Sequence, residues 1–88
     1  MIEAGAYDRD WPSIHMTPEE SVQAHLDLHG RRLMPIHNGT FDLALHSWTE
    51  PFERVISHAK VTNAAVLTPR FGERVEIRAP AESTSWWR

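Results

Sequence analysis

The pattern that most constrains this chain is a helix start at Thr17 with short apolar runs on both sides. Thr17 is a typical N-cap, Pro18 suits the first helical position, and Glu20 completes a capping box. We predict a helix over residues 18–29 that ends at Gly30, because glycine readily adopts the left-handed conformation that follows many helices. The apolar runs predict one strand before this helix, within residues 2–7, and one after it, within residues 32–37.

A second helix start follows at Thr49. This residue is the expected N-cap, and Glu50 and Pro51 occupy the first turn. Apolar residues then recur with helical spacing from Phe52 to Ala59, which predicts one face that packs into the core. The first half of the chain is thus followed by a second helix that can cover the same sheet.

The remaining sequence predicts two more strands and a tail. Residues 64–68 form a short apolar run, and residues 74–78 alternate, with Val75 and Ile77 expected to point inward. Residues 79–88 are rich in Ser and Pro and are expected to form a flexible tail with exposed tryptophans. The predicted order is therefore β-α-β-α-β-β, an α/β fold with a mostly parallel sheet.

Composition narrows the chemistry that such a fold can carry. The chain has 88 residues and no cysteine, so a metal here would need histidine or carboxylate ligands. A net charge of −3 argues against a nucleic-acid partner, which favours a basic face. No apolar run is long enough for a transmembrane segment, and the first residues do not resemble a secretory signal. We therefore expect a cytoplasmic protein.

Histidines are the residues most suited to form a site. His37 ends a predicted strand and precedes a turn at Gly39. Because one imidazole alone is not a metal site, the simpler interpretation is that His37 forms a hydrogen bond in the turn. The alternative is that it is a metal ligand. His25 and His29 share a helix face with core residues, which favours a structural role over a metal site. His15 precedes the first helix, on the same side of the sheet as His37, where parallel sheets usually carry their chemistry.

A longer motif gives these positions a context. The stretch GAYDRDWPSIHMTPEESVQAHLDLHGRRLMPIHNGTFDLALHSWTEPFERV resembles the C-terminal part of metallo-β-lactamase-fold hydrolases, in the branch of N-acylphosphatidylethanolamine phospholipase D. Members of that branch carry a GAY strand, a loop that ends in histidine, a helix that opens on PEEA and a strand that ends in IHWGTF. The resemblance implies that residues 1–78 form the C-terminal half of an αββα sandwich.

The resemblance also implies roles for two histidines. His37 matches the last histidine ligand of a two-metal, zinc-type centre, and His15 matches a histidine that helps to hold the phospholipid substrate. The main ligand motif of the superfamily, HxHxDH, does not occur in this sequence, and Asn38 stands where the branch has tryptophan. The chain would therefore lack most of the metal ligands of a complete enzyme.

Three hypotheses follow. The first is a C-terminal fragment of a metal-dependent phosphodiesterase-like hydrolase, inactive alone, that needs a complementing N-terminal half to act on a lipid or another phosphodiester. The alternative is a non-catalytic module that self-associates through the apolar face of half a sandwich. In the third, His15 and His37 of two chains together bind one zinc ion.

Overall fold

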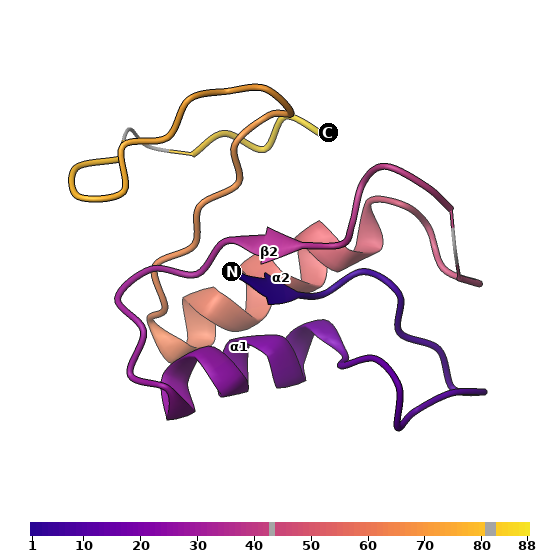
Figure 1. The fold of residues 1–88 in the computed structure, drawn as a ribbon. Coiled ribbons are helices and arrows are strands. Elements are labelled where there is room, and N and C mark those ends of the chain that lie inside the picture. Colours follow the sequence, from indigo (N-terminus) through magenta and orange to yellow (C-terminus); the bar gives the residue numbers. More distant parts are fainter. Residues whose placement is uncertain (43, 81–82) are drawn as a thin grey trace.

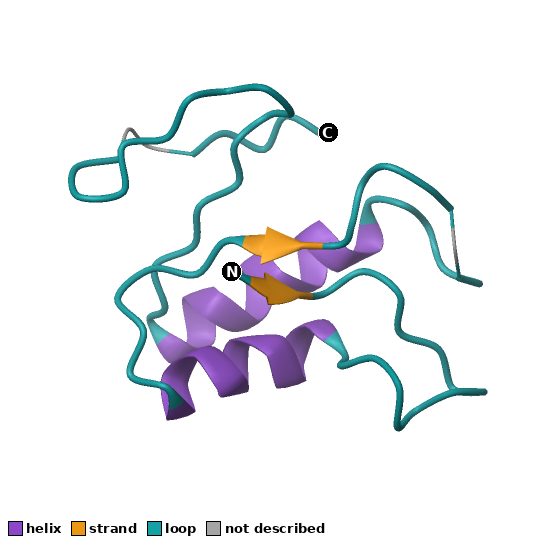
Figure 2. Ribbon diagram, viewed as in Figure 1, coloured by secondary structure: helices purple, strands orange, loops and turns teal. Residues whose placement is uncertain are grey.

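The computed structural model describes residues 1–42, 44–80 and 83–88. Its elements are β1 (Ile2–Glu3), α1 (Pro18–Asp27), β2 (Pro35–Ile36) and α2 (Glu50–Thr62). Figure 1 shows the two short strands side by side and the two helices close together, and Figure 2 shows that loops make up most of the remaining chain. The described residues thus form a mixed α/β structure with two helices and a two-stranded sheet.

The first helix forms where its local signals predict. The Thr17 side chain accepts a hydrogen bond from the Glu20 backbone N–H, and the Glu20 carboxylate accepts one from the Thr17 N–H, which completes the predicted capping box. The helix ends at Asp27, two residues earlier than predicted. The left-handed residue that follows is His29, at φ 55°, rather than Gly30. The backbone therefore turns before the glycine, whose N–H bonds back to the carbonyl of His25.

The sheet is parallel and very short. Ile2 pairs with Pro35 and Glu3 with Ile36, and the Ala4 N–H adds a hydrogen bond of 3.0 Å to the Ile36 carbonyl. Pro35 has no N–H to donate, which limits the ladder on this strand. Both predicted strands therefore exist, but each spans two residues instead of six.

The two later strands differ from the prediction. In place of a strand over residues 64–68, one parallel bridge joins Val66 to Leu33. The prediction of a strand over 74–78 is wrong: these residues form no strand pairing with another described segment, and Ile77 is 69% exposed instead of inward. Alternation makes a strand possible, but a strand also needs an edge to pair with. The predicted β-α-β-α-β-β order is therefore not formed in full.

Side chains from both helices and both halves of the chain make the core. The fully buried cluster consists of Ala4 beside β1, Val22 on α1, Leu33 before β2 and Val55 on α2. Val55 belongs to the apolar stripe predicted for the second helix, which is confirmed as a core face. α2 begins after Thr49 as predicted, although no cap hydrogen bond forms from the Thr49 side chain. Burial of its apolar face therefore stabilises this helix more than its N-cap does.

The C-terminal residues pack against α2. The expected exposure of the tryptophans is wrong for Trp87, which is 6% exposed and stacks on Phe52 with ring centroids 4.6 Å apart. Its indole N–H donates to Glu53 Oε1 at 2.7 Å, and the Arg88 guanidinium also bonds to this carboxylate. The flexibility of residues 79–88 stays a prediction, but the last two residues are held on the helix.

We predict that acid releases this C-terminal contact. Hydrogen bonds from Arg88 and Trp87 lower the pKa of Glu53 to about 2 from an ordinary value of 4.5. Because the pKa is lower in the folded state, the stabilisation is fully present above pH 4.5 and is lost as the pH falls through about 2. Tryptophan fluorescence should report a transition in this window. Glu53→Gln should remove that transition; an unchanged transition in the variant would assign it to another group.

Candidate functional site

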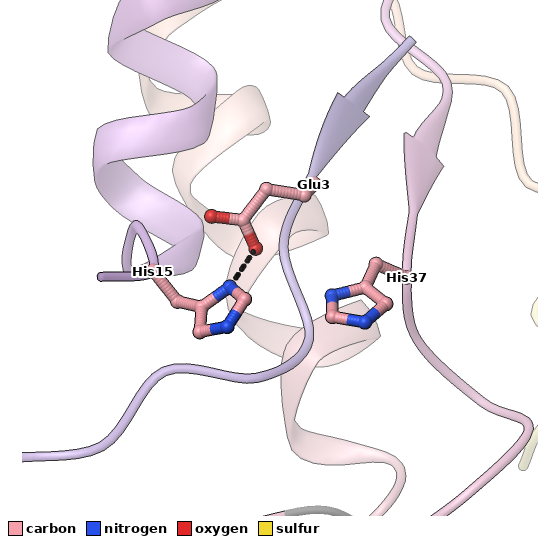
Figure 3. Close-up of side chains that lie close together, drawn as sticks. All are labelled: Glu3, His15 and His37. Atoms are coloured by element: carbon pink, nitrogen blue, oxygen red, sulfur yellow. Dashed lines mark ion pairs between the residues drawn. The ribbon is translucent and has the colours of Figure 1, made fainter. Parts of the chain in front are cut away.

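One cluster of possible metal ligands lies at the carboxyl ends of the two strands. Glu3 is the last residue of β1, His37 directly follows β2, and His15 comes from the loop that leads into α1 (Figure 3). Because the strands run parallel, their carboxyl ends meet at one edge, and the capping box at Thr17 fixes where the loop arrives. Sequence positions that are far apart are thereby brought together.

The three side chains are close enough to share one ion. Glu3 Oε2 lies 3.4 Å from His15 Nδ1, and the His15 and His37 rings have centroids 5.3 Å apart with an interplanar angle of 33°. One ligand atom from each residue lies within 4.8 Å of those from the other two. Glu3 and His15 are half-buried, whereas His37 is exposed. The cluster is therefore open to solvent on the His37 side.

One oxygen of the Glu3 carboxylate is held by a hydrogen bond, and the other makes the ion-pair contact with His15. Its Oε1 accepts a hydrogen bond of 2.7 Å from the Met16 N–H, and the Ser21 hydroxyl donates to the Glu3 backbone carbonyl. Among the described residues Glu3 Oε2, which is buried, has no hydrogen-bond partner. The oxygen that faces His15 is therefore an acceptor with unused capacity.

Backbone geometry places His37. This residue has φ 61°, in the left-handed region that non-glycine residues seldom adopt. Its carbonyl passes so close to Gly5 that a Cβ at residue 5 would lie 1.9 Å from the His37 oxygen and 2.7 Å from Asn38 Cα. The glycine of the GAY motif thus allows the two chain segments to approach each other at the site.

The donor set fits a divalent metal of the zinc type. Zinc binds imidazole nitrogen and carboxylate oxygen, and catalytic zinc sites have three protein ligands and one open position. The observation in this structure that favours such an ion is a buried carboxylate oxygen that accepts no hydrogen bond from the described residues and lies 3.4 Å from an imidazole nitrogen. Glu3, His15 and His37 are the residues that would hold it.

The structure brings the two predicted site residues together, and the two helical histidines, for which a structural role was favoured, lie outside the cluster. His15 and His37 meet, as their common side of the sheet predicts, whereas His25 is buried on α1 with its ring against Gly30. His29 is exposed after α1, outside the cluster. Sequence reasoning missed Glu3; its place two residues before the GAY glycine, at the end of a strand, is the signal that could have identified it.

An apolar cavity lies next to the cluster. It has a volume of about 440 Å³, and His37 belongs to both its wall and the metal-ligand group. Four aromatic side chains from separate parts of the chain contribute to its wall, and Arg70 adds a positive charge. The aromatic residues are Phe41, Phe52, Phe71 and Trp86.

A comparison with known protein families finds a match in the same region of the chain. Residues 1–38 match the family model of the beta-lactamase superfamily domain. This segment contains β1, α1, β2 and all three residues of the cluster. The match supports the predicted metallo-β-lactamase fold and a hydrolase-like character. The particular branch stays a prediction.

Similar proteins extend the likeness to the whole chain. Uncharacterized proteins of Mycobacterium tuberculosis and Mycobacterium bovis are each 44% identical over 91 residues, which cover 100% of this chain and 24% of each relative. The outer membrane protein RomA of Klebsiella pneumoniae is 49% identical over 39 residues, 44% of this chain and 30% of that protein. No solved structure matches. The chain thus spans about a quarter of the length of its mycobacterial relatives.

Within the described ranges, neither helix is both long and apolar enough to cross a bilayer.

Proposed function

We propose that this chain supplies one side of the active site of a metal-dependent hydrolase that cleaves phosphodiester bonds, as in the phospholipase branch that it resembles. The observation that carries the proposal is the juxtaposition of His15 and His37, two histidines 22 positions apart in sequence whose rings lie 5.3 Å apart. The beta-lactamase superfamily match over the same residues supports the assignment of the site to hydrolase chemistry.

The two histidines have different roles in this proposal. His37 binds a metal; it directly follows β2, and its ring lies beside that of His15. His15 lies next to it and donates an N–H hydrogen bond to a phosphoryl oxygen of the substrate. A zinc-type metal held at His37 would supply Lewis acidity toward the phosphoryl group and a more acidic bound water. The chain's own contribution is to position the substrate next to that metal.

The apolar cavity favours a substrate with a hydrocarbon part. A phosphodiester bound at His15 and His37 would have the aromatic wall of the cavity directly beside it, since His37 also lines the cavity. Apolar walls with a few polar groups are typical of small-molecule sites. A phospholipid has both a phosphodiester for the two histidines and hydrocarbon chains for the cavity. Arg70 is available to bind an oxygen of its headgroup or phosphate.

The activity requires more of the protein than these 88 residues. The HxHxDH ligands are absent from the sequence, and the chain spans 24% of its mycobacterial relatives. We propose that the remaining metal ligands come from a complementing N-terminal half.

A second candidate function, a self-associating module, is favoured by apolar side chains at the cavity that a monomer seldom exposes. These are Ile36, Phe41 and Phe71.

A chimera tests the hydrolase proposal. This chain replaces the matching segment of the Mycobacterium tuberculosis relative, and zinc-loaded protein is assayed on bis(p-nitrophenyl) phosphate and on vesicles of N-acylphosphatidylethanolamine. We expect hydrolysis by the chimera, no hydrolysis by the isolated chain, and a loss of at least about 100-fold in His37→Asn. Asparagine is used because it tolerates the left-handed backbone at this position.

Controls separate the histidine from general damage. His58→Ala removes a histidine on α2 outside the cluster and should leave the rate unchanged. Full activity in His37→Asn, or no hydrolysis by a folded, zinc-loaded chimera, would contradict the proposed function.

Sedimentation of the isolated chain tests the second candidate: a stable monomer at micromolar concentration would exclude the self-associating module.

A further inference from the structure

We infer that this chain alone binds one divalent cation of the zinc type, with Glu3, His15 and His37 as its three protein ligands. The inference goes beyond the proposed function, because it needs neither the HxHxDH ligands nor hydrolysis. It also assigns a direct role to Glu3. In the isolated chain His15 is a ligand, whereas in a protein that supplies further ligands it is available to the substrate.

The distance between Glu3 and His15 suits a shared metal better than a direct hydrogen bond. Ligand atoms that lie 2.0–2.1 Å from zinc in a tetrahedron are about 3.3–3.4 Å from one another. Glu3 Oε2 and His15 Nδ1 are 3.4 Å apart. A charge-assisted hydrogen bond would be about 2.7–2.9 Å long. The pair thus has the separation of two neighbouring ligands.

The second observation is that Glu3 Oε2 accepts no hydrogen bond from the described residues and makes the 3.4 Å contact with His15 instead. Glu3 Oε2 is buried and has no hydrogen-bond partner among the described residues, whereas Oε1 is fixed by the Met16 N–H. A buried acceptor without a partner costs free energy, and more so when it is charged. A cation between Glu3 and His15 would remove this cost without moving the backbone.

His37 is the third ligand, and its exposed side of the cluster gives the ion access from solvent. Its ligand atom lies within 4.8 Å of those of the other two residues, and its ring is exposed. We expect rotation about the side-chain torsions of His37 to close the remaining gap when the ion binds. Three protein ligands leave one position of a tetrahedral zinc ion for water. Because this side of the cluster is open to solvent, the ion can enter without unfolding the chain.

Titration of the 88-residue chain with Zn²⁺, followed by calorimetry, tests the inference. We expect one ion per chain. Glu3→Gln, His15→Ala and His37→Asn should each weaken binding by at least about tenfold, because even outer-shell partners of metal sites are worth 10–100-fold. A stoichiometry of one ion per two chains would overturn the single-chain site in favour of an intermolecular one.

Matched variants control for charge and for histidine content. Glu76→Gln removes an exposed carboxylate and His58→Ala a histidine on α2, and neither should change the affinity. Equal losses in the controls and the site variants would overturn the inference. If a site variant fails to fold, the absorption spectrum of the unaltered chain with bound Co²⁺ tests the site in its place. The intense visible bands of four-coordinate cobalt support the site, and the weak spectrum of aqueous Co²⁺ overturns it.

The outcomes separate this inference from the proposed function. Zinc binding by the isolated chain, without hydrolysis by the chimera, contradicts the hydrolase proposal alone. Hydrolysis by the chimera, without zinc binding by the isolated chain, contradicts the three-ligand site alone.

Discussion

Gly5→Ala should unfold the chain or separate β1 from the segment after β2. The added Cβ would lie 1.9 Å from the His37 carbonyl oxygen and 2.7 Å from Asn38 Cα. Both are backbone atoms, so no side-chain rotation can relieve the contact. Overpacking typically costs 1–3 kcal/mol where side chains can adjust, and we expect at least about 3 kcal/mol here.

That loss is large for a chain of this size. Domains have about 0.05–0.15 kcal/mol of stability per residue, which gives roughly 4–13 kcal/mol for 88 residues. Urea denaturation followed by circular dichroism measures the change, and zinc titration of any folded variant should show a weakened site. The same separation of the strands moves Glu3 away from His37.

Gly72→Ala is the comparison for Gly5→Ala. It adds the same methyl group where no atom lies within 4 Å of the new Cβ, although its φ of 81° carries a strain cost of about 1–2 kcal/mol. Gly5→Ala should therefore be the more destabilising of the two. Equal stability of Gly5→Ala and the unaltered chain would show that the close approach at His37 is not required.

Leu33→Ala should have the next largest effect. Leu33 is 1% exposed and belongs to the central cluster with Val22 and Val55, so its truncation leaves a cavity between the two helices. Buried leucine-to-alanine changes cost about 2–5 kcal/mol. For a domain of this length the melting temperature should fall by roughly 10 °C or more.

Leu28→Ala provides the matched control for Leu33→Ala. Leu28 is 76% exposed after the end of α1, so the same truncation there should change the melting temperature little. The backbone of Leu33 also bonds to Ala65 and Leu67, at 2.8 Å in each case, and alanine retains these bonds. A melting temperature that falls equally in both variants would indicate that the core lies elsewhere.

The helices could be predicted from the sequence because their signals are local. The capping box joins Thr17 to Glu20, and the apolar stripe of α2 lies within its own 13 residues. Strand extent depends instead on a partner that is distant in sequence. Residues 74–78 have the alternation of a strand, yet without an edge to pair with they remain irregular and leave Ile77 exposed.

The candidate site could also be predicted only in part, for the two histidines but not for the carboxylate. That His15 and His37 meet follows from where parallel strands and their loops end, a rule of topology. Glu3 could not be chosen, because two-residue pairing leaves no alternation from which to determine the face that a side chain occupies. The family motif names histidines and a glycine, while the carboxylate beside them emerges only from the three-dimensional arrangement.

The pairing of β1 with β2 has a kinetic consequence. The contacts that hold the chain together join residues that are roughly thirty positions apart: Ile2 with Pro35, Leu33 with Val66, and Glu53 with Trp87. Each requires closure of a long loop, whose entropy is lost before the contact stabilises the chain. We expect the helices to form first and the chain to fold more slowly than a helical hairpin of equal length. The Glu3, His15 and His37 cluster would then form last, once both ends of the first loop have met.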